Sequence, residues 1–454
     1  MFFILLVNIV LSATYIIPED FELIQDAVHE ASDGDSIIVM PGTYYENILI
    51  EGKVVSIISA DGPLVTCING NSSGPVITYD SVSDSSAILR GFTITNGTGE
   101  FINGANYGGG VLSKYSMPIL DNLIISNNTA FAGGGVCYYA LESTYNHPII
   151  SNTIIENNLA SEGGGVFCVN HSITIRNSEI NSNGMDMFGS GGGVQILLSS
   201  INLNNVIISQ NQTKFGGGIY IASSDGIVKN TTIKDNLAES RGGGIWIGGG
   251  SDLDIERSLI SGNHSIGFGG GAFISFSNLD FLHSTISSNI IDSNVLGAAI
   301  YSDGGYSEIK NSIIYFNRKE GDSSPNYNLG GYSANMFIEY NASYSDIEGS
   351  DIPQGIGMIS QDPLFEDLEN DNYLLNLDSP CIGTGENGAD MGRYPYQEFI
   401  AGDLNGDSLI NILDVILTVD LVLNASYSLS ADINLDSSVD ILDVVLIVNL
   451  ILDV

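Results

Sequence analysis

Two acidic loops near the C-terminus carry the side chains best suited to holding a metal ion. Each loop has twelve residues, and the loops begin 29 residues apart, at Asp403 and Asp432. Loop positions 1, 3, 5, 7, 9 and 12 are Asp403, Asn405, Asp407, Leu409, Asn411 and Asp414 in the first copy, and Asp432, Asn434, Asp436, Ser438, Asp440 and Asp443 in the second. Carboxylate and amide oxygens at alternating positions, with a backbone carbonyl at position 7, are hard ligands that suit calcium. The repeated spacing predicts two calcium sites, and acidic turns without a metal are the alternative.

An apolar helix is expected after each loop, because Ile412 and Ile441 begin matching apolar runs. Residues 401–454 contain nine Asp and no Lys, Arg or Glu. Loop position 6 is Ser408 in one copy and Ser437 in the other, where loops of this kind usually carry Gly for a sharp turn. This departure is expected to weaken the calcium sites.

A second candidate site is a set of aromatic residues, each of which stands two positions after a glycine repeat. These residues are Tyr220, Trp246, Phe273 and Tyr301. Successive residues of a strand point to opposite faces, so all four are expected on the outer face of successive strands. Broad apolar ring faces suit the apolar faces of sugars. The row predicts a carbohydrate-binding platform, and a stack of rings that only covers the sheet is the alternative.

No constellation of residues identifies a catalytic site. The histidines are scattered, and each is expected at a turn or on the surface: His29, His147, His171, His264 and His283. Lys229 and Arg241 lie near acidic residues in the sequence, as the base of a calcium-dependent lyase would, but solvated loop charges show the same pattern. The catalytic residues therefore stay unassigned, and whether the protein is an enzyme stays open.

Glycine triplets divide most of the chain into repeats. They begin at Gly108, Gly133, Gly163, Gly191, Gly216, Gly242 and Gly269, at steps of 25 to 30 residues. A repeat of this length is typical of a solenoid, in which each coil packs on its neighbours. The segments between the triplets are short and β-branched, with no room for a helix. Each coil is expected to hold about three short strands that pair in parallel with those of the next coil.

An Ile-x-x-Asn motif recurs at the same step. Its members are Ile125/Asn128, Ile155/Asn158, Ile180/Asn183, Ile208/Asn211, Ile233/Asn236, Ile260/Asn263, Ile286/Asn289 and Ile314/Asn317. Stacked coils place each Ile above the one before, which predicts an inward ladder. The Asn residues are expected at turns, where they tolerate left-handed backbone conformations and can bond one another along the stack. An earlier Asn, such as Asn205, often stands three residues before the Ile.

The acidic composition limits the kinds of molecule that the protein is expected to bind. The net charge is −40, from 53 acidic and 13 basic residues. Nucleic-acid binding needs a basic surface, so the sequence predicts no nucleic-acid partner. The four cysteines show neither metal nor disulfide spacing, and a bridge between Cys137 and Cys168 is not expected because the repeat places them on opposite faces of their strands.

The chain is expected to have three parts. Residues 1–14 are predicted to be a signal peptide, because Phe2 to Leu11 is apolar except for Asn8 and small residues follow; a buried strand is the alternative. Residues 15–397 are predicted to form the solenoid, and residues 398–454 the calcium-binding module. No later segment is long enough for a membrane helix, so no transmembrane segment is expected in the mature chain. The protein is expected to be secreted or attached to a cell surface.

The repeats resemble those of right-handed parallel β-helix proteins of the pectate-lyase-like superfamily. The resemblance lies in the segment from Ile24 to Ile50, in GFTITNG at Gly91–Gly97, in the N-x-x-I-x-x-N coils with their glycine triplets, and in the closing DPLFEDLENDNYLLNLDSPCIGTG. It implies the fold class, an all-β solenoid of the right-handed parallel β-helix type followed by a small α-helical calcium-binding domain. The superfamily includes lyases, glycoside hydrolases, epimerases and adhesins, so the resemblance implies no single activity.

The two C-terminal loops resemble a type I dockerin module, which binds a cohesin in scaffolded polysaccharide-degrading complexes. The resemblance implies calcium as cofactor and a cohesin-like protein as partner. The apolar pairs Ile412-Leu413 and Ile441-Leu442 stand where many dockerins carry hydroxyl residues, so the partner's identity stays open. Together these features predict a secreted β-helix protein that binds or degrades polysaccharide and is attached to a cohesin-like partner. A surface adhesin or structural β-helix protein without catalysis is the alternative.

Overall fold

The computed structural model describes residues 12–452 apart from 83–85, 143–146, 295, 323, 325–327, 332–338, 350–352, 397–399, 406–408, 425, 429, 435 and 437. Most of the predicted signal peptide therefore lies outside the described residues. The chain divides into two compact units, Met1–Pro363 with Gly383–Tyr394, and Leu364–Ile382 with Pro395–Val454. Each unit is described by itself.

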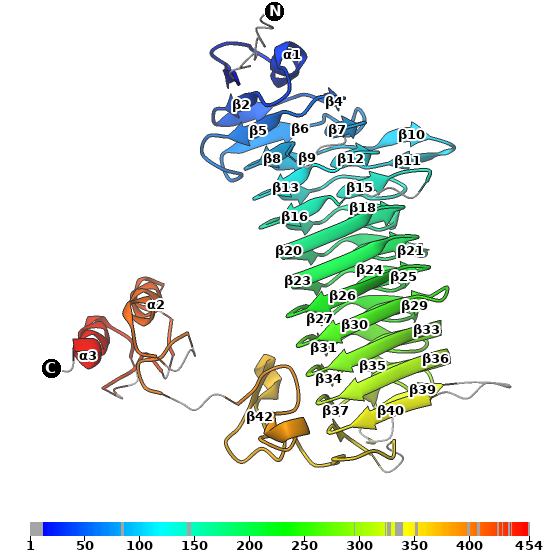
Figure 1. The fold of residues 1–454 in the computed structure, drawn as a ribbon, viewed down its shortest axis with the longest axis vertical. Coiled ribbons are helices and arrows are strands. Elements are labelled where there is room, and N and C mark those ends of the chain that lie inside the picture. The colour runs from blue at the N-terminus through cyan, green and yellow to red at the C-terminus, as the bar shows by residue number, and fades with distance from the viewer. Residues whose placement is uncertain are drawn as a thin grey trace, which may run out of the picture. The chain divides into compact units, whose positions relative to one another are not determined.

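The first unit is a parallel β-solenoid of about 10 turns (Figure 1). Its N-terminal coils contain β1 (Thr14–Ile17), β2 (Ser36–Val39), β3 (Gly42–Tyr44), β4 (Ile48–Glu51), β5 (Ser56–Ser59), β6 (Thr66–Asn69), β7 (Ile77–Asp80), β8 (Ile88–Arg90) and β9 (Thr93–Thr95). The helix α1 (Ile24–Glu30) buries Ile24, Ala27 and Val28, which is the apolar face predicted for a helical cap. A hairpin of β10 (Glu100–Ile102) and β11 (Ala105–Tyr107) extends from the early coils.

Each later coil contributes a strand to three successive faces. The strands that follow the glycine triplets are β12 (Val111–Lys114), β15 (Val136–Tyr139), β19 (Val166–Val169), β22 (Val194–Leu197), β25 (Ile219–Ala222), β29 (Ile245–Gly248) and the first parts of β33 (Ala272–Leu282) and β36 (Ile300–Lys310), with β39 (Leu329–Gly331) beside β36. The second face holds β13 (Ile119–Asp121), β16 (Ile149–Ser151), β26 (Asp225–Lys229), β30 (Asp252–Glu256), β40 (Glu339–Ser343) and parts of β20 (Ser172–Asn181), β23 (Ser200–Ser209), β33 and β36. The third holds β14 (Ile124–Ser126), β17 (Ile154–Glu156), β27 (Thr232–Lys234), β31 (Leu259–Ser261), β34 (Thr285–Ser287), β37 (Ile313–Tyr315), β41 (Asp346–Ile347) and the remainders of β20 and β23.

A separate seven-stranded parallel sheet lies just before the glycine triplets. It contains β18 (Leu159–Glu162), β21 (Gly184–Ser190), β24 (Gln212–Phe215), β28 (Leu237–Arg241), β32 (His264–Ser265), β35 (Ile290–Ile291) and β38 (Arg318–Lys319). Register shifts interrupt its pairing, for example between Thr213 and Phe215. This sheet is important for the candidate site, because its last residues lie beside the aromatic row.

The predicted isoleucine ladder is confirmed. Ile208 pairs in register with Ile180 of the preceding coil and Ile233 of the following coil. All eight motif isoleucines are 0% exposed. One side of the core of the first unit is therefore a stack of isoleucines along the solenoid axis.

The second residue of the motif forms a buried amide ladder. In Asn211, the side-chain nitrogen Nδ2 donates to the Oδ1 of Asn236 at 3.0 Å and to the carbonyl oxygen of Ile180 at 2.9 Å. The same amide-to-amide bond recurs from Asn128 to Asn328 at 2.8–3.1 Å. The earlier Asn of each coil, such as Asn205 at φ +57°, has the left-handed conformation predicted for a turn. The motif Asn residues therefore form the buried ladder, whereas the earlier Asn residues form left-handed turns.

Steric contacts explain the glycine triplets. Gly242 has φ +69°, a conformation that favours glycine. A Cβ at Gly243 would lie 2.5 Å from the carbonyl oxygens of both His264 and Gly270. The coils therefore approach too closely at this corner for any side chain.

Gly243→Ala is expected to destabilise the solenoid by about 1–3 kcal/mol, because the added methyl group forces backbone apart. Gly42→Ala is the matched control, since a Cβ there would meet only the Tyr44 ring at 3.5 Å or more and Gly42 has no positive φ. Chemical denaturation of both variants measures the difference. Equal stability of the two variants would contradict the close approach at the triplet.

Residues Gly383–Tyr394 return along the side of several coils. The Gly392 amide donates to the Asn311 carbonyl at 2.8 Å, and the Arg393 amide to Thr285 Oγ1 at 3.0 Å. The Arg393 guanidinium reaches two coils further, to the carbonyl oxygens of Asn230 and Thr231, both at 3.2 Å. This segment, with the 3-10 helix η3 (Glu386–Gly388), ties non-adjacent coils together.

The second unit contains short elements. They are β42 (Phe365–Asp367), the 3-10 helix η2 (Leu368–Asn370), β43 (Asn372–Leu375), α2 (Ile412–Leu423) and α3 (Ile441–Leu452). The two helices that the sequence predicted after the acidic loops are thus confirmed, and Val415, Val444 and Ile447 form their small core. Among the described residues, no helix has the length and apolar character needed to cross a membrane. All four cysteines are free, as expected.

Candidate functional site

The four predicted aromatic residues occupy one row on successive strands. Tyr220, Trp246, Phe273 and Tyr301 pair in register across β25, β29, β33 and β36. The Tyr220 and Trp246 rings are stacked, with centroids 4.2 Å apart and planes 3° from parallel. The Phe273 and Tyr301 rings are also stacked, at 5.5 Å and 6°. We call these four residues the aromatic row.

Only one half of the aromatic row is open. Tyr220 and Trp246 are partly exposed, whereas Phe273 is 1% exposed and Tyr301 8%. Phe268 packs on Tyr301 at 4.8 Å between centroids, and the Arg241 guanidinium lies 5.0 Å from the Phe273 centroid. The expectation that all four rings offer their faces to a sugar is therefore corrected. For Tyr220 and Trp246 sugar contact stays a prediction.

The row is also covered at its N-terminal end. Leu112, Cys137 and Phe167 occupy the same position on earlier coils, and they pack with Tyr107 of the hairpin and with Tyr139. The Tyr220–Trp246 pair is thus an open stretch between two covered ones. Next to it on β22, Gln195 is 3% exposed and its Oε1 has no hydrogen-bond partner.

Gly248 makes room for the Trp246 ring. A Cβ at Gly248 would lie 2.3 Å from the indole atom Cη2, so only Gly leaves room for the ring along the strand. On Tyr220, burial and to a lesser extent the Glu162 carboxylate raise the pKa of the phenol. Tyr220 is therefore a neutral hydrogen-bond donor over the physiological range of pH.

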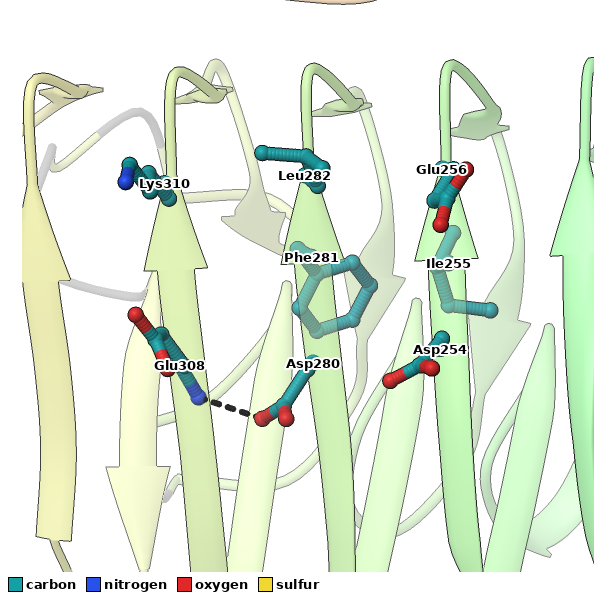
Figure 2. A pocket seen from close by; sticks show the side chains of 8 residues that line it. All are labelled: Asp254, Ile255, Glu256, Asp280, Phe281, Leu282, Glu308 and Lys310. Carbon is teal, nitrogen blue, oxygen red and sulfur yellow. Dashed lines mark hydrogen bonds between the residues drawn. The ribbon is translucent and has the colours of Figure 1, made fainter. Parts of the chain in front are cut away.

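A second candidate lies on another face of the solenoid, in a groove of about 290 Å³ over β30, β33 and β36 (Figure 2). Its lining residues are Asp254, Ile255, Glu256, Asp280, Phe281, Leu282, Glu308 and Lys310. The backbone amide of Glu308 donates to Asp280 Oδ1 at 2.7 Å. Acidic side chains thus alternate with buried apolar ones along three neighbouring strands.

The Asp280 carboxyl is electrostatically perturbed. Burial raises its pKa, the Glu308 amide lowers it, and the charges of Asp254, Glu308 and Asp252 raise it again, so that the net pKa lies above its usual range. A carboxyl group with a raised pKa is a candidate proton donor. Asp280 is therefore the residue of the groove to examine first for catalysis.

The structure separates the two cations that the sequence placed near acidic residues. Lys229 forms an ion pair with Glu256 at 2.7 Å, at the edge of the groove. Arg241 lies instead beside the aromatic row. The groove acids were missed, although Asp254, Asp280 and Glu308 share one register position on successive coils, which the repeat spacing could have revealed.

The two C-terminal loops have matching hydrogen bonds. Asp414 accepts from the amides of Leu404 at 2.8 Å and Asn411 at 2.9 Å. Asp443 accepts in the same way from Ile433 and Asp440, both at 2.9 Å. The two copies therefore share one loop conformation in their described residues.

The donor chemistry of the loops fits calcium. Asp414 and Asp443 are 0% exposed, and Asp403 and Asp432 are 9% and 1% exposed. Burial raises the pKa of Asp414, but the amides of Asn411, Leu404 and Asn405 outweigh it and hold the pKa below its usual range. Ionised oxygen ligands without sulfur or nitrogen suit a hard cation.

The loop geometry does not by itself assemble a metal centre. Asp407 lies outside the described residues, and Leu409 is 65% exposed. Within the described part of the chain, neither loop nor groove gathers three His, Cys, Asp or Glu side chains in a way that could hold a metal ion. Calcium binding by these residues therefore stays a prediction.

Comparison with known proteins supports the fold. A family model described as "Right handed beta helix region" matches residues 192–326. No curated protein matches the sequence. Pectate lyase Pel9A is 12% identical, with 86% of this chain and 98% of that chain covered and a TM-score of 0.47. The A-module of Azotobacter vinelandii mannuronan C-5 epimerase AlgE4 is 12% identical, with 75% and 92% covered and a TM-score of 0.31.

A GH87 alpha-1,3-glucanase catalytic unit from Streptomyces thermodiastaticus strain HF3-3 is 13% identical, with 74% of this chain and 65% of that chain covered and a TM-score of 0.27. All three likenesses are at low sequence identity. The predicted right-handed β-helix is confirmed for the matched residues.

Proposed function

We propose that this protein is an exported, carbohydrate-directed β-helix protein that binds polysaccharide at Tyr220 and Trp246. The observation that carries the proposal is the parallel ring pair, which is partly exposed between two covered stretches of the same row. Because the two rings stack face to face on adjacent coils, their outward edges form an apolar strip that extends along the solenoid. Exposed aromatic groups of this size on a soluble protein commonly mark a binding surface.

The C-terminal module supplies attachment in this proposal. Calcium bound in the two loops orders α2 and α3, which then bind a cohesin-like protein. Two observations support this: the loops are duplicated in conformation, and both helices expose large apolar side chains. The most exposed are Ile412, Leu413, Ile416, Leu423, Ile441, Leu442, Val445 and Leu452. A partner that covers such side chains gains hydrophobic free energy.

The groove of Figure 2 makes catalysis the second candidate function. The raised pKa of Asp280 beside other acids is the observation that favours it. In this case the protein would cleave or modify the polysaccharide that it binds. An adhesin without catalysis would bind glycans and release no product.

Affinity electrophoresis of the whole chain through gels that contain single polysaccharides tests the binding function. At least one polysaccharide should retard the wild type, and Trp246→Ala should weaken that retardation at least about tenfold, because a ring face at the centre of a small site carries much of the binding energy. Tyr45→Ala is the matched control, since Tyr45 is an aromatic residue that is 68% exposed on an N-terminal coil. Equal retardation of all three proteins in every gel would rule out the site. Analysis of released products then separates an enzyme from a binder.

A further inference from the structure

Arg241 lies at the corner of the solenoid beside Phe273, the covered residue that follows Trp246 in the aromatic row. It is the last residue of β28 and directly precedes the triplet that begins at Gly242. The turn is tight, since a Cβ at Gly242 would lie 3.0 Å from the backbone nitrogen of Trp246. The guanidinium lies 5.0 Å from the centroid of Phe273, which pairs in register with Trp246. Arg241 and the Trp246 strand therefore meet at one corner.

The Arg241 charge is not neutralised by the protein. Within the described part of the chain it has no ion-pair partner, and its buried Nε has no hydrogen-bond acceptor. Aromatic rings hold it instead, Phe268 at 5.9 Å and Phe273 at 5.0 Å. By contrast, Arg318 binds both carboxylate oxygens of Glu348 at 2.6 Å.

The amino-acid composition does not explain why Arg241 lacks a carboxylate partner. The chain has 53 acidic and 13 basic residues, so acids are abundant. Lys214 on the neighbouring strand β24 also has no ion pair among the described residues, and its Nζ lies 5.2 Å from the Phe215 ring. Phe215 and Arg241 are register partners. One flank of the row thus carries two cations held by aromatic rings.

We propose that the Tyr220–Trp246 site takes an acidic sugar, a uronate, whose carboxylate binds Arg241. The inference rests on the proposed carbohydrate function and names its substrate class. The sugar lies against the outward edges of the stacked pair, and the planar guanidinium offers paired donors that match a carboxylate. A neutral sugar offers the guanidinium only hydroxyl acceptors, which form weaker bonds than a carboxylate does.

Glu162 is expected to influence the direction of the bound sugar. The register Glu162–Ser190–Phe215–Arg241 places it three coils before Arg241, and its charge acts on the Tyr220 hydroxyl. A uronate carboxylate at the Glu162 end meets a like charge, so it is directed to the Arg241 end. Removing the Glu162 charge should therefore favour acidic ligands further.

Titration calorimetry of the whole chain tests the inference with polygalacturonate, alginate and glucuronan, each paired with its own methyl ester. The two members of a pair share one sugar backbone and differ at the carboxyl group, which is charged in the acid and a neutral methyl ester in its partner. The wild type should bind at least one acid form at least about tenfold more tightly than its ester, because a charge-assisted bond to a guanidinium is worth that much or more. Arg241→Gln should reduce this preference to about twofold or less, and Arg241→Lys should keep part of it.

Glu162→Gln is an independent test variant. It leaves Arg241 intact and should raise the affinity for the acid form of the polysaccharide. Thermal unfolding of each variant establishes that it is folded. Binding of neutral glycans or esters alone, or a preference that survives in Arg241→Gln, would overturn the inference and leave the proposed function standing. A chain that binds no glycan of any kind would overturn both.

Discussion

Ile208→Asp is expected to cost several kcal/mol of stability and to unfold the solenoid under conditions in which the wild type is folded. Ile208 is 0% exposed and stacks between Ile180 and Ile233 on the neighbouring coils. A carboxylate there is buried without a partner, which costs several kcal/mol whether it stays charged or takes up a proton. The coils on either side lose their packing as well, because each coil of a solenoid depends on its neighbours.

Ile207→Asp is the matched control for this prediction. Ile207 is the preceding residue of the same strand, but it points to the outer face and is 41% exposed. Its replacement should cost about 1 kcal/mol or less. Guanidinium unfolding followed by circular dichroism compares the two variants. Similar losses in both would mean that the assigned register of β23 is wrong.

Removal of calcium is expected to destabilise the C-terminal module by about 2.7 kcal/mol for each site that is saturated a hundredfold above its Kd. Asp414 and Asp443 are buried acids of the two loops, and calcium coordination would draw the other loop carboxylates toward them, where their charges repel one another without the cation. With calcium the repulsion is replaced by coordination, so that binding free energy adds to folding free energy. A loss of this size is large for so small a unit.

Calorimetric titration of the whole chain with calcium measures this prediction. Two binding events are expected, of which Asp403→Ala removes one and Asp432→Ala the other. Asp420→Ala is the control, because Asp420 is an exposed acid on α2 outside both loops and should leave both events unchanged. Limited proteolysis should cleave after residue 400 only when the metal is chelated. Resistance to proteolysis that is identical with and without chelator would contradict calcium-dependent order.

The repeat spacing was sufficient to predict the register of the coils. Ile208 and Asn211 recur every 25 to 30 residues, and each falls directly on its counterpart in the next coil. This works because a solenoid turns a one-dimensional repeat into direct contacts between equivalent residues. The two roles of Asn were not separated, since all were expected at left-handed turns, whereas Asn205 has a positive φ and Asn211 lies buried in the amide ladder.

The exposure of the aromatic row could not be predicted in the same way. Alternation along β33 and β36 places Phe273 and Tyr301 on the outer face, but Phe268 and Arg241 from the preceding segments cover that face. These covering residues stand next to irregular pairings in β28 and its neighbours. An irregular segment has no periodicity from which its side-chain directions follow.

The groove acids were missed for a related reason. Asp254 and Asp280 lie on the second face, outside the glycine triplets and the Ile-x-x-Asn motif, although their spacing matches the repeat. Their electrostatic properties depend on the burial of Asp280 and on the charge of Glu308, one coil further. The perturbed pKa of Asp280 depends on residues of three strands together, so the sequence of any one strand does not reveal it.

The most direct test of the account uses Trp246, the single Trp of the chain. Its indole stacks on Tyr220 at 4.2 Å, so its fluorescence reports on the proposed sugar site and on no other part of the molecule. Titration with a polysaccharide that retards the protein in a gel should shift the emission of Trp246 in a saturable way, with the same midpoint as binding measured by calorimetry. Binding by calorimetry with an unchanged Trp246 spectrum would place the glycan elsewhere and contradict the account.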